Sequence, residues 1–176
     1  MAPLLVDLAQ LREFADQAGF ERWLAANHDS ASELWVRIWK KGSGQPSLTP
    51  AEAVESCLCW GWIDATRKSW DKISFIQRYT PRRPRSIWSQ VNRSHVERLV
   101  AEGLMTVHGL RQVEAAKADG RWDAAYAPGR SMEMPPALMD AIAADPAALA
   151  TFITLTRQNR FALAFRFGKL KTEAGR

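Results

Sequence analysis

The sequence has little of what secreted, membrane-spanning or disulfide-bonded proteins need. Only two of its 176 residues are cysteines, Cys57 and Cys59, and they lie too close along the chain for a relaxed disulfide. They are typical of reduced thiols in a cytosolic protein. No apolar run approaches the ~20 residues that span a bilayer, and Asp7 interrupts an N-terminus without a basic segment. We therefore expect a cytoplasmic protein with no secretory signal and no membrane span.

Motifs for cofactors and common catalytic machinery are also missing. The three histidines, His28, His95 and His108, lack metal-ligand spacing, so we expect no metal and no cofactor. The sequence has no P-loop, no G-x-G-x-x-G and no G-x-S-x-G. Cys59 becomes a candidate nucleophile only if the fold brings a histidine to it, and a buried thiol near a helix end is the alternative. The sequence leaves open whether the protein is an enzyme.

Positive charge and tryptophan are concentrated in the middle of the chain. The net charge is +5, but residues 67–98 hold nine Lys or Arg against two Asp or Glu. Residues 151–176 hold six against one, and six of the eight tryptophans lie between residues 35 and 88. Such blocks favour an anionic partner, although a solvated basic face produces the same pattern.

Cap and turn residues predict the order of helices and strands. Thr49, Pro50 and Glu52 form a capping-box start for a helix that ends near Gly61. The remaining predicted elements are helices over 16–27, 87–102, 109–119, 135–143, 146–155 and 158–167, and strands over 33–40, 63–70 and 73–80, the last two joined as a hairpin. In this prediction Asp16, Ser86 and Asp145 are helix caps.

This order indicates an α+β protein with a small antiparallel β-sheet, packed helices and a mostly helical C-terminal half. The length fits one domain over residues 1–176. Within it we expect an α+β part over about 14–100 and a helical part over about 101–176.

Two runs of residues predict a ligand-binding pocket. In the first, Gly61 ends a helix and Asp64 follows at the start of a strand. In the second, arginines on a proline-stiffened loop lead into a helix, whose N-terminus and guanidinium groups suit a carboxylate or phosphate. The predicted ligand-binding residues are Trp62, Asp64, Tyr79, Arg82, Arg85, Ser86, Trp88, Ser89 and Asn92. The alternative is that the tryptophans close the core and the arginines point into solvent.

Three runs together resemble the YdeI/OmpD-associated family, also called bacteriocin-protection proteins. They are Leu58-Cys-x-Gly-Trp-Ile-Asp64, Thr80-Pro-Arg-Arg-x-x-Ser-x-Trp-Ser89 with Asn92, and Ala116-Lys-x-Asp-Gly-Arg-Trp-Asp123. The resemblance extends over about residues 14–173. It implies a role in stress or antimicrobial-peptide resistance, and the family is sometimes described as periplasmic.

Three functions fit these observations. The first is binding of a small anionic ligand in a pocket lined by tryptophan and arginine. The second is binding of nucleic acid or another polyanion by basic side chains interleaved with aromatic rings. The third is protein interaction without chemistry. The salt dependence of binding separates the first from the second, because polyanion contacts weaken steeply as salt rises.

Overall fold

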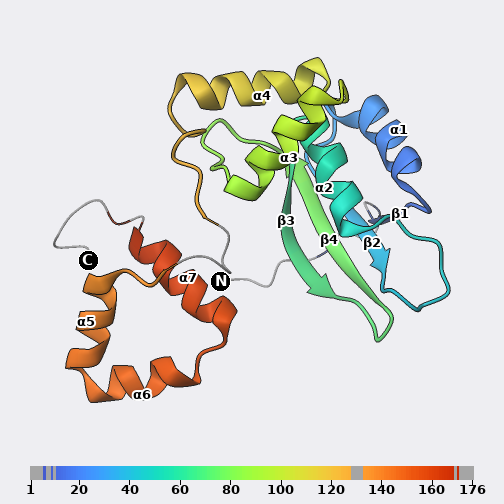
Figure 1. The fold of residues 1–176 in the computed structure, drawn as a ribbon. Helices are drawn as coiled ribbons and strands as arrows, with labels where there is room; N and C mark the ends of the chain where they lie inside the picture. Colours follow the sequence, from blue (N-terminus) through green and yellow to red (C-terminus); the bar gives the residue numbers. More distant parts are fainter. Residues whose placement is uncertain (1–5, 7–8, 10, 128–132, 169, 171–176) are drawn as a thin grey trace. The chain divides into compact units, whose positions relative to one another are not determined.

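The computed structural model describes residues 6, 9, 11–127, 133–168 and 170. The chain forms two compact units, Met1–Ala125 and Tyr126–Arg176. The first unit holds a sheet and helices, and the second is helical over its described residues (Figure 1). The predicted α+β class and the mostly helical C-terminal half are confirmed. That residues 1–176 form a single domain stays a prediction.

The sheet has four strands in the order β1-β2-β4-β3. Strands β2 (Leu34–Trp39), β4 (Ser74–Pro81) and β3 (Trp62–Ser69) pair antiparallel, with β3 and β4 joined as the predicted hairpin. Strand β1 (Leu11–Glu13) was not predicted and runs parallel to β2, so the sheet is mixed. Three residues are too few to show the alternation that identifies a strand.

Four helices of the first unit begin at side-chain caps. They are α1 (Gln17–Asn27), α2 (Pro50–Cys59), α3 (Gln90–Ala101) and α4 (Val107–Ala118). The predicted capping box of α2 is present: the Thr49 hydroxyl accepts from the Glu52 N–H, and the Glu52 carboxylate accepts from the Thr49 N–H. Asp16 caps α1 as predicted, accepting from the Gly19 N–H at 2.7 Å.

Helix α3 begins later than the sequence predicts. Its N-cap is Ser89, whose hydroxyl accepts from the Asn92 N–H at 3.1 Å, and not Ser86. The Ser86 hydroxyl instead accepts from the Arg83 N–H at 2.9 Å and closes a turn in the preceding loop. Arg121 holds this loop through a 2.9 Å hydrogen bond to the Ser86 carbonyl, so tertiary contacts moved the start of the helix by one turn.

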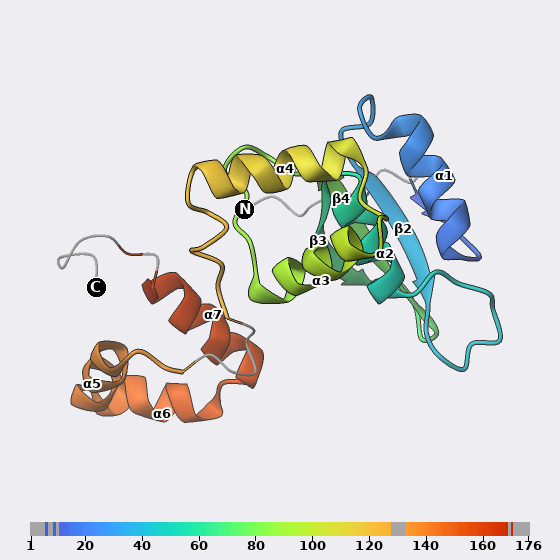
Figure 2. The ribbon, with the colours of Figure 1, turned by 45° about the horizontal axis from the view of Figure 1, so that its top comes forward.

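Helix α2 supplies side chains to two separate hydrophobic clusters. On one side, Ala53 and Cys57 pack with α1 over one face of the sheet. On the other side, Leu58 and Cys59 pack with α3 and α4. Figure 2 shows α1, α2 and α3 side by side, with α4 running across the end of α2. The first unit is therefore layered, with α2 between its two cores.

The end of α2 approaches α4 closely at a glycine. A Cβ atom on Gly109 would lie 2.8 Å from the Cys59 carbonyl carbon and closer still to the Leu58 and Cys59 carbonyl oxygens. Thr106, the N-cap of α4, fixes the same junction by donating its hydroxyl to the Cys59 carbonyl at 2.6 Å. Only a residue without a side chain fits this contact.

The second unit contains α5 (Pro136–Ala144), α6 (Pro146–Thr154) and α7 (Arg157–Gly168). Asp145 caps α6 as predicted, accepting from the Ala147 N–H at 2.8 Å. In the described parts of the chain, no single helix is long and apolar enough to cross a membrane. Helices α5 and α6 pass that test of length and composition only as a pair, and the pair is bent by 118°.

Candidate functional site

Two of the predicted site residues, Trp62 and Tyr79, lie in the hydrophobic cluster that packs with α1, whereas Trp88 lies in the cluster with α3 and α4. The indole of Trp62 is 1% exposed, and its Nε1 donates to the His28 carbonyl at 3.0 Å. Tyr79 is 0% exposed and its ring packs 5.6 Å from that of Phe20. Burial raises the pKa of the Tyr79 hydroxyl, with the charges of Cys57 and Asp64 adding to the effect. Asp64 itself is exposed and stands opposite Tyr79 in the β3–β4 register.

Arg82 and Trp88, near the two ends of the loop of residues 82–89, pack against each other. The Arg82 guanidinium carbon lies 3.6 Å from the centroid of the Trp88 ring, and Arg82 as a whole is only 5% exposed. Nη1 of Arg82 donates to the Ile87 carbonyl at 3.4 Å. A desolvated guanidinium on an indole face is a favourable cation–π pair. The two side chains hold each other at the boundary between core and surface.

Two further cations lie close to Trp122, which follows α4 in the chain. Trp122 packs edge-on against Trp88 at 5.0 Å between ring centroids. Arg93 and Lys117 lie 5.2 Å and 5.8 Å from the Trp122 ring, and Arg93 also donates to the Trp122 carbonyl at 2.9 Å. We call this group the cationic tryptophan cluster: Arg82, Trp88, Arg93, Lys117, Arg121 and Trp122.

The remaining predicted residues border this cluster. Arg85 is exposed, Ser86 is half-buried in the loop, and Ser89 and Asn92 form the first turn of α3. The structure thus brings Arg82, Arg85, the two serines, Trp88 and Asn92 into one short segment and its helix start. Arg93, Lys117, Arg121 and Trp122 were not among the predicted ligand-binding residues. The Gly-Arg-Trp run that follows α4 could have identified Arg121 and Trp122.

The two thiols are poor nucleophiles. Cys57 and Cys59 are buried, and burial raises the pKa of both. The pKa of Cys59 reaches about 11, with the carboxylates of Glu21 and Glu55 adding to the effect of burial. Neither thiol is therefore a thiolate at neutral pH. Among the described residues, no group of three or more His, Cys, Asp or Glu side chains could hold a metal ion.

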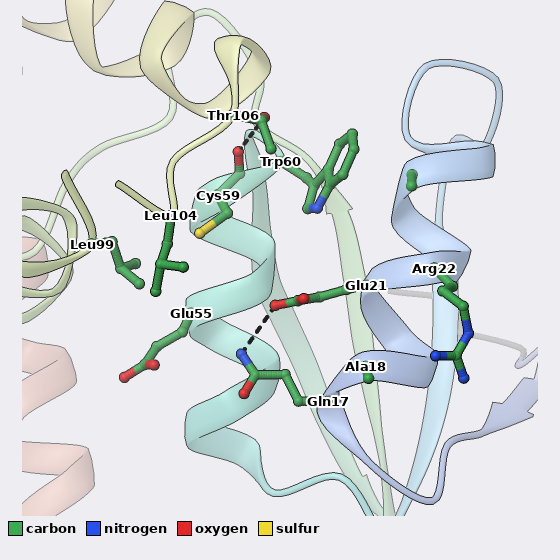
Figure 3. A pocket seen from close by; sticks show the side chains of 11 residues that line it. Gln17, Ala18, Glu21, Arg22, Glu55, Cys59, Trp60, Leu99, Leu104 and Thr106 are labelled. Atoms are coloured by element: carbon green, nitrogen blue, oxygen red, sulfur yellow. Dashed lines mark hydrogen bonds between the residues drawn. The ribbon is translucent and has the colours of Figure 1, made fainter. Parts of the chain in front are cut away.

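A pocket of about 520 Å³ lies between α1 and α3, with α2 as its floor (Figure 3). Gln17 and Glu21 project from α1, Glu55, Cys59 and Trp60 come from α2 and its end, and Leu99, Leu104 and Thr106 complete the opposite side. None of the predicted site residues lines it. Sequence reasoning missed this pocket because its residues come from four separate segments that meet only in the folded chain.

The two carboxylates of the pocket differ in their partners. Glu55 contacts the Arg98 guanidinium and the imidazole of His95, the latter at 3.2 Å. Among the described residues, Glu21 accepts only from neutral groups, the Gln17 amide at 3.2 Å and the Ser56 hydroxyl at 3.0 Å, both through Oε1. Ser56 is 0% exposed, so this contact fixes one side of the Glu21 carboxylate.

Two histidines meet beside Trp60. Nε2 of His28 lies 3.1 Å from Nδ1 of His108, and the His108 ring stacks on Trp60 at 5.7 Å between centroids. Desolvation lowers the pKa of His108, and the charges of His28 and Arg111 lower it further. His108 therefore stays neutral to lower pH than an ordinary histidine.

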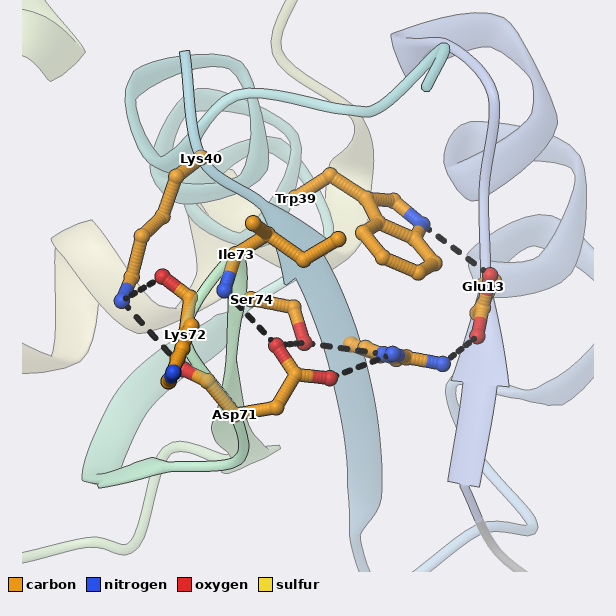
Figure 4. A network of polar contacts seen from close by, with 8 residues as sticks. Glu13, Trp39, Lys40, Asp71, Lys72, Ile73 and Ser74 are labelled. Atoms are coloured by element: carbon orange, nitrogen blue, oxygen red, sulfur yellow. Dashed lines mark hydrogen bonds and ion pairs between the residues drawn. The ribbon is translucent and has the colours of Figure 1, made fainter. Parts of the chain in front are cut away.

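A polar network lies at the opposite end of the sheet (Figure 4). Arg37 donates to Asp71 at 2.7 Å, to Glu13 at 3.1 Å and to the Ser74 hydroxyl at 3.0 Å. Its guanidinium carbon also lies 3.9 Å from the Trp39 ring centroid. Arg37 thereby joins β1, β2 and the β3–β4 turn, which indicates a structural role.

Comparison with known families gives two matches. Residues 12–112 match a family described as a domain of unknown function, DUF8412. Residues 131–176 match the family described as "Bacteriocin-protection, YdeI or OmpD-Associated", which confirms that resemblance over this C-terminal region. Two of the runs that first indicated this family, 58–64 and 80–92, lie within the DUF8412 match. The third run, 116–123, lies between the two matched regions. No curated protein and no solved structure matches the chain.

Proposed function

We propose that this chain, which belongs to the DUF8412 family through residues 12–112, binds a small anionic ligand beside the cationic tryptophan cluster. The observation that carries the proposal is the pair of tryptophans with cations on their faces, next to two exposed arginines, Arg83 and Arg85. Flat apolar rings and guanidinium groups together suit a ligand with a carboxylate or phosphate and an aromatic part.

The charge around the cluster supports an anion. Arg121 and Lys117 have carboxylate partners of their own, Asp119 at 2.8 Å and Glu114 at 3.3 Å, so the positive charge available to an anion lies on the loop beside the cluster. No acidic side chain occurs in the loop of residues 82–89, so Arg83 and Arg85 add positive charge without a neighbouring carboxylate in sequence. The α3 N-terminus at Ser89 adds a partial positive charge.

Buried donors in the predicted site also fit this proposal. Tyr79 Oη and Trp88 Nε1 are buried, and neither has a hydrogen-bond partner in the part of the chain that the structure describes. Buried donors are normally satisfied. Of the two, Trp88 belongs to the cluster, and an anionic oxygen is the kind of group that its indole N–H binds. In this proposal Arg85, Ser86, Ser89 and Asn92 contact the ligand, Arg82 and Trp88 form its wall, and Asp64 borders it. Trp62 and Tyr79 support the site from the core.

Titration calorimetry with phenyl phosphate tests the proposal. We expect one site per chain, and at least about tenfold weaker binding after Arg85→Ala, because a lost charge-assisted hydrogen bond costs about 1.5–3 kcal/mol. Arg111→Ala removes an exposed arginine of α4 and is the matched control, expected to change affinity by less than about twofold. Absence of binding, or equal affinity of the Arg85→Ala variant, contradicts the proposal.

The second candidate, a nucleic-acid-binding module, is favoured by the net charge of residues 67–98. Fluorescence anisotropy with a labelled single-stranded oligonucleotide between about 50 and 200 mM salt separates the two candidates. A site that contacts many phosphates loses orders of magnitude in affinity over this range, whereas a small pocket loses only a few-fold.

The biological role that we propose is protection against antimicrobial peptides. It rests on the name of the family that residues 131–176 match, bacteriocin protection. Cells that lack the protein should be inhibited by a lower concentration of a cationic bacteriocin than cells that carry it. Complementation with the Arg85→Ala variant then shows whether protection depends on the anion site. Equal sensitivity of cells with and without the protein contradicts the role.

A further inference from the structure

We propose that the pocket between α1 and α3 is a second binding site, and that it takes an organic cation: an amine attached to a flat or aliphatic apolar body. The site is distinct from the proposed anion site, because none of its lining residues belongs to the cationic tryptophan cluster or to the loop of residues 82–89. Its volume of about 520 Å³ lies within the usual range for small-molecule pockets.

The charge of the pocket favours a cation. Glu21 receives hydrogen bonds only from the neutral Gln17 and Ser56 side chains, and within the described chain no cationic side chain lies at ion-pair distance from it. Arg22 follows Glu21 in sequence, but its guanidinium is directed away from the Glu21 carboxylate (Figure 3). The carboxylate is therefore held in place without a counter-ion. An ammonium group would supply that counter-ion through a charge-assisted hydrogen bond.

The neighbouring charges strengthen this preference. Glu55, also in the pocket wall, is engaged by Arg98 and His95. Its negative charge is balanced there. Arg22 also lines the pocket, but its guanidinium is directed away from the Glu21 carboxylate (Figure 3). An anionic ligand would meet two carboxylates, and a neutral apolar ligand would leave Glu21 without a counter-ion. Both are disfavoured relative to an amine.

The walls of the pocket determine the rest of the ligand. Leu99 and Leu104 present aliphatic surface from α3 and the segment after it, and Leu104 is 56% exposed. Trp60 adds apolar surface at the end of α2. In Figure 3 the Glu21 side chain reaches into the pocket from α1, and Leu99 and Leu104 lie on the opposite side. The fitting ligand thus has a charged end and an apolar end.

Tryptamine and its neutral analogue tryptophol form a matched pair of probes. With the full chain in titration calorimetry, we expect tryptamine to bind at one site per chain, at least about tenfold more tightly than tryptophol. Glu21→Gln keeps the shape of the side chain and removes its charge, and it should lower the tryptamine affinity to that of tryptophol. Glu97→Gln, at an exposed position of α3 outside the pocket, is the control and should change the affinity by less than about twofold.

A second variant keeps the test independent of any folding defect in Glu21→Gln. Ala18 is exposed, lines the pocket and lies three residues before Glu21 on α1. Ala18→Lys places a tethered ammonium next to the carboxylate. It should weaken tryptamine binding at least about tenfold while leaving the thermal unfolding temperature at or above that of the parent. Undiminished tryptamine binding by a folded Ala18→Lys variant overturns the proposal.

Three other results also overturn the proposal: no tryptamine binding, equal affinity for tryptamine and tryptophol, or an unchanged affinity in Glu21→Gln. Phenyl phosphate should not compete with tryptamine, since the two ligands occupy different sites. Failure of one site therefore leaves the test of the other intact.

Discussion

Replacing Gly109 by alanine tests the contact that joins α2 to α4. The added Cβ would lie 2.8 Å from the Cys59 carbonyl carbon, where ordinary contacts are 3.4–4 Å. The obstructing atoms belong to the backbone at the end of α2, so they cannot rotate away as a side chain would. Helix α4 must move away from α2 by more than half an ångström, roughly the difference between these distances.

The expected loss of stability follows from three contributions. Overpacking typically costs about 1–3 kcal/mol. The Thr106 hydroxyl bond to the Cys59 carbonyl is stretched from 2.6 Å, and such a bond contributes about 1 kcal/mol. Alanine is favoured over glycine within a helix by roughly 0.5–1 kcal/mol, which offsets part of the loss. The net expectation is a free energy of unfolding lower by about 2 kcal/mol.

Urea unfolding followed by circular dichroism measures this difference, and Gly19→Ala is its matched control. Gly19 occupies the third position of α1, as Gly109 does in α4, but the atom nearest to a Cβ added at Gly19 would be a side-chain atom, the Asp16 Oδ1 that caps α1, at 3.3 Å. Gly19→Ala should be neutral or stabilising. If Gly109→Ala is as stable as the parent, or stabilising to the same extent as Gly19→Ala, the described approach of α4 to α2 is wrong.

Four further outcomes are expected. Thr49→Ala should lower the free energy of unfolding by about 1 kcal/mol, measured by urea unfolding, without changing phenyl phosphate affinity, because it removes only the α2 cap. The pKa of His108 is lowered in the fold, so the unfolded chain binds a proton at this position at higher pH than the folded chain does. The free energy of unfolding should therefore fall as the pH drops below about 6.5. Urea unfolding at several pH values should show a smaller fall for His108→Gln. Hydrogen bonds from Ser74, the Ile73 N–H and Arg37 lower the pKa of Asp71. Its stabilising contribution is therefore present above the ordinary carboxyl pKa and is lost as pH falls through the lowered pKa. In Asp71→Asn, the free energy of unfolding should decrease less at acidic pH than in the parent. With a thiol reagent such as DTNB at pH 8, neither cysteine should react in the native protein and both should react in denaturant, since both thiols are buried and their pKa is raised.

Local features of the fold could be predicted from the sequence because their causes are local. The capping box at Thr49 and Glu52, the cap at Asp16 and the turn between β3 and β4 each depend on residues within a few positions of one another. Strand β1 could not be predicted, because its three residues become a strand only by pairing with β2.

The start of α3 shows where local reasoning fails. Ser86 and Ser89 are equally good caps by residue type. In the folded chain the Ser86 carbonyl accepts from Arg121, which follows α4, and this contact is not visible in the local sequence. The same limitation applies to the candidate sites. The arginine-rich loop is visible as a run of residues, whereas Glu21 acquires its significance only through Ser56, which lies 35 residues away in sequence.

The position of α2 between two hydrophobic clusters has a consequence for how the first unit opens. Ala53 and Cys57 belong to the cluster over the sheet, whereas Leu58 and Cys59 belong to the cluster with α3 and α4. Separating either cluster strips α2 of half its packing, so partial opening on one side destabilises the other. Amide hydrogens in α2 should then exchange with solvent only through global unfolding of the unit, at rates that match those of the central strand β4.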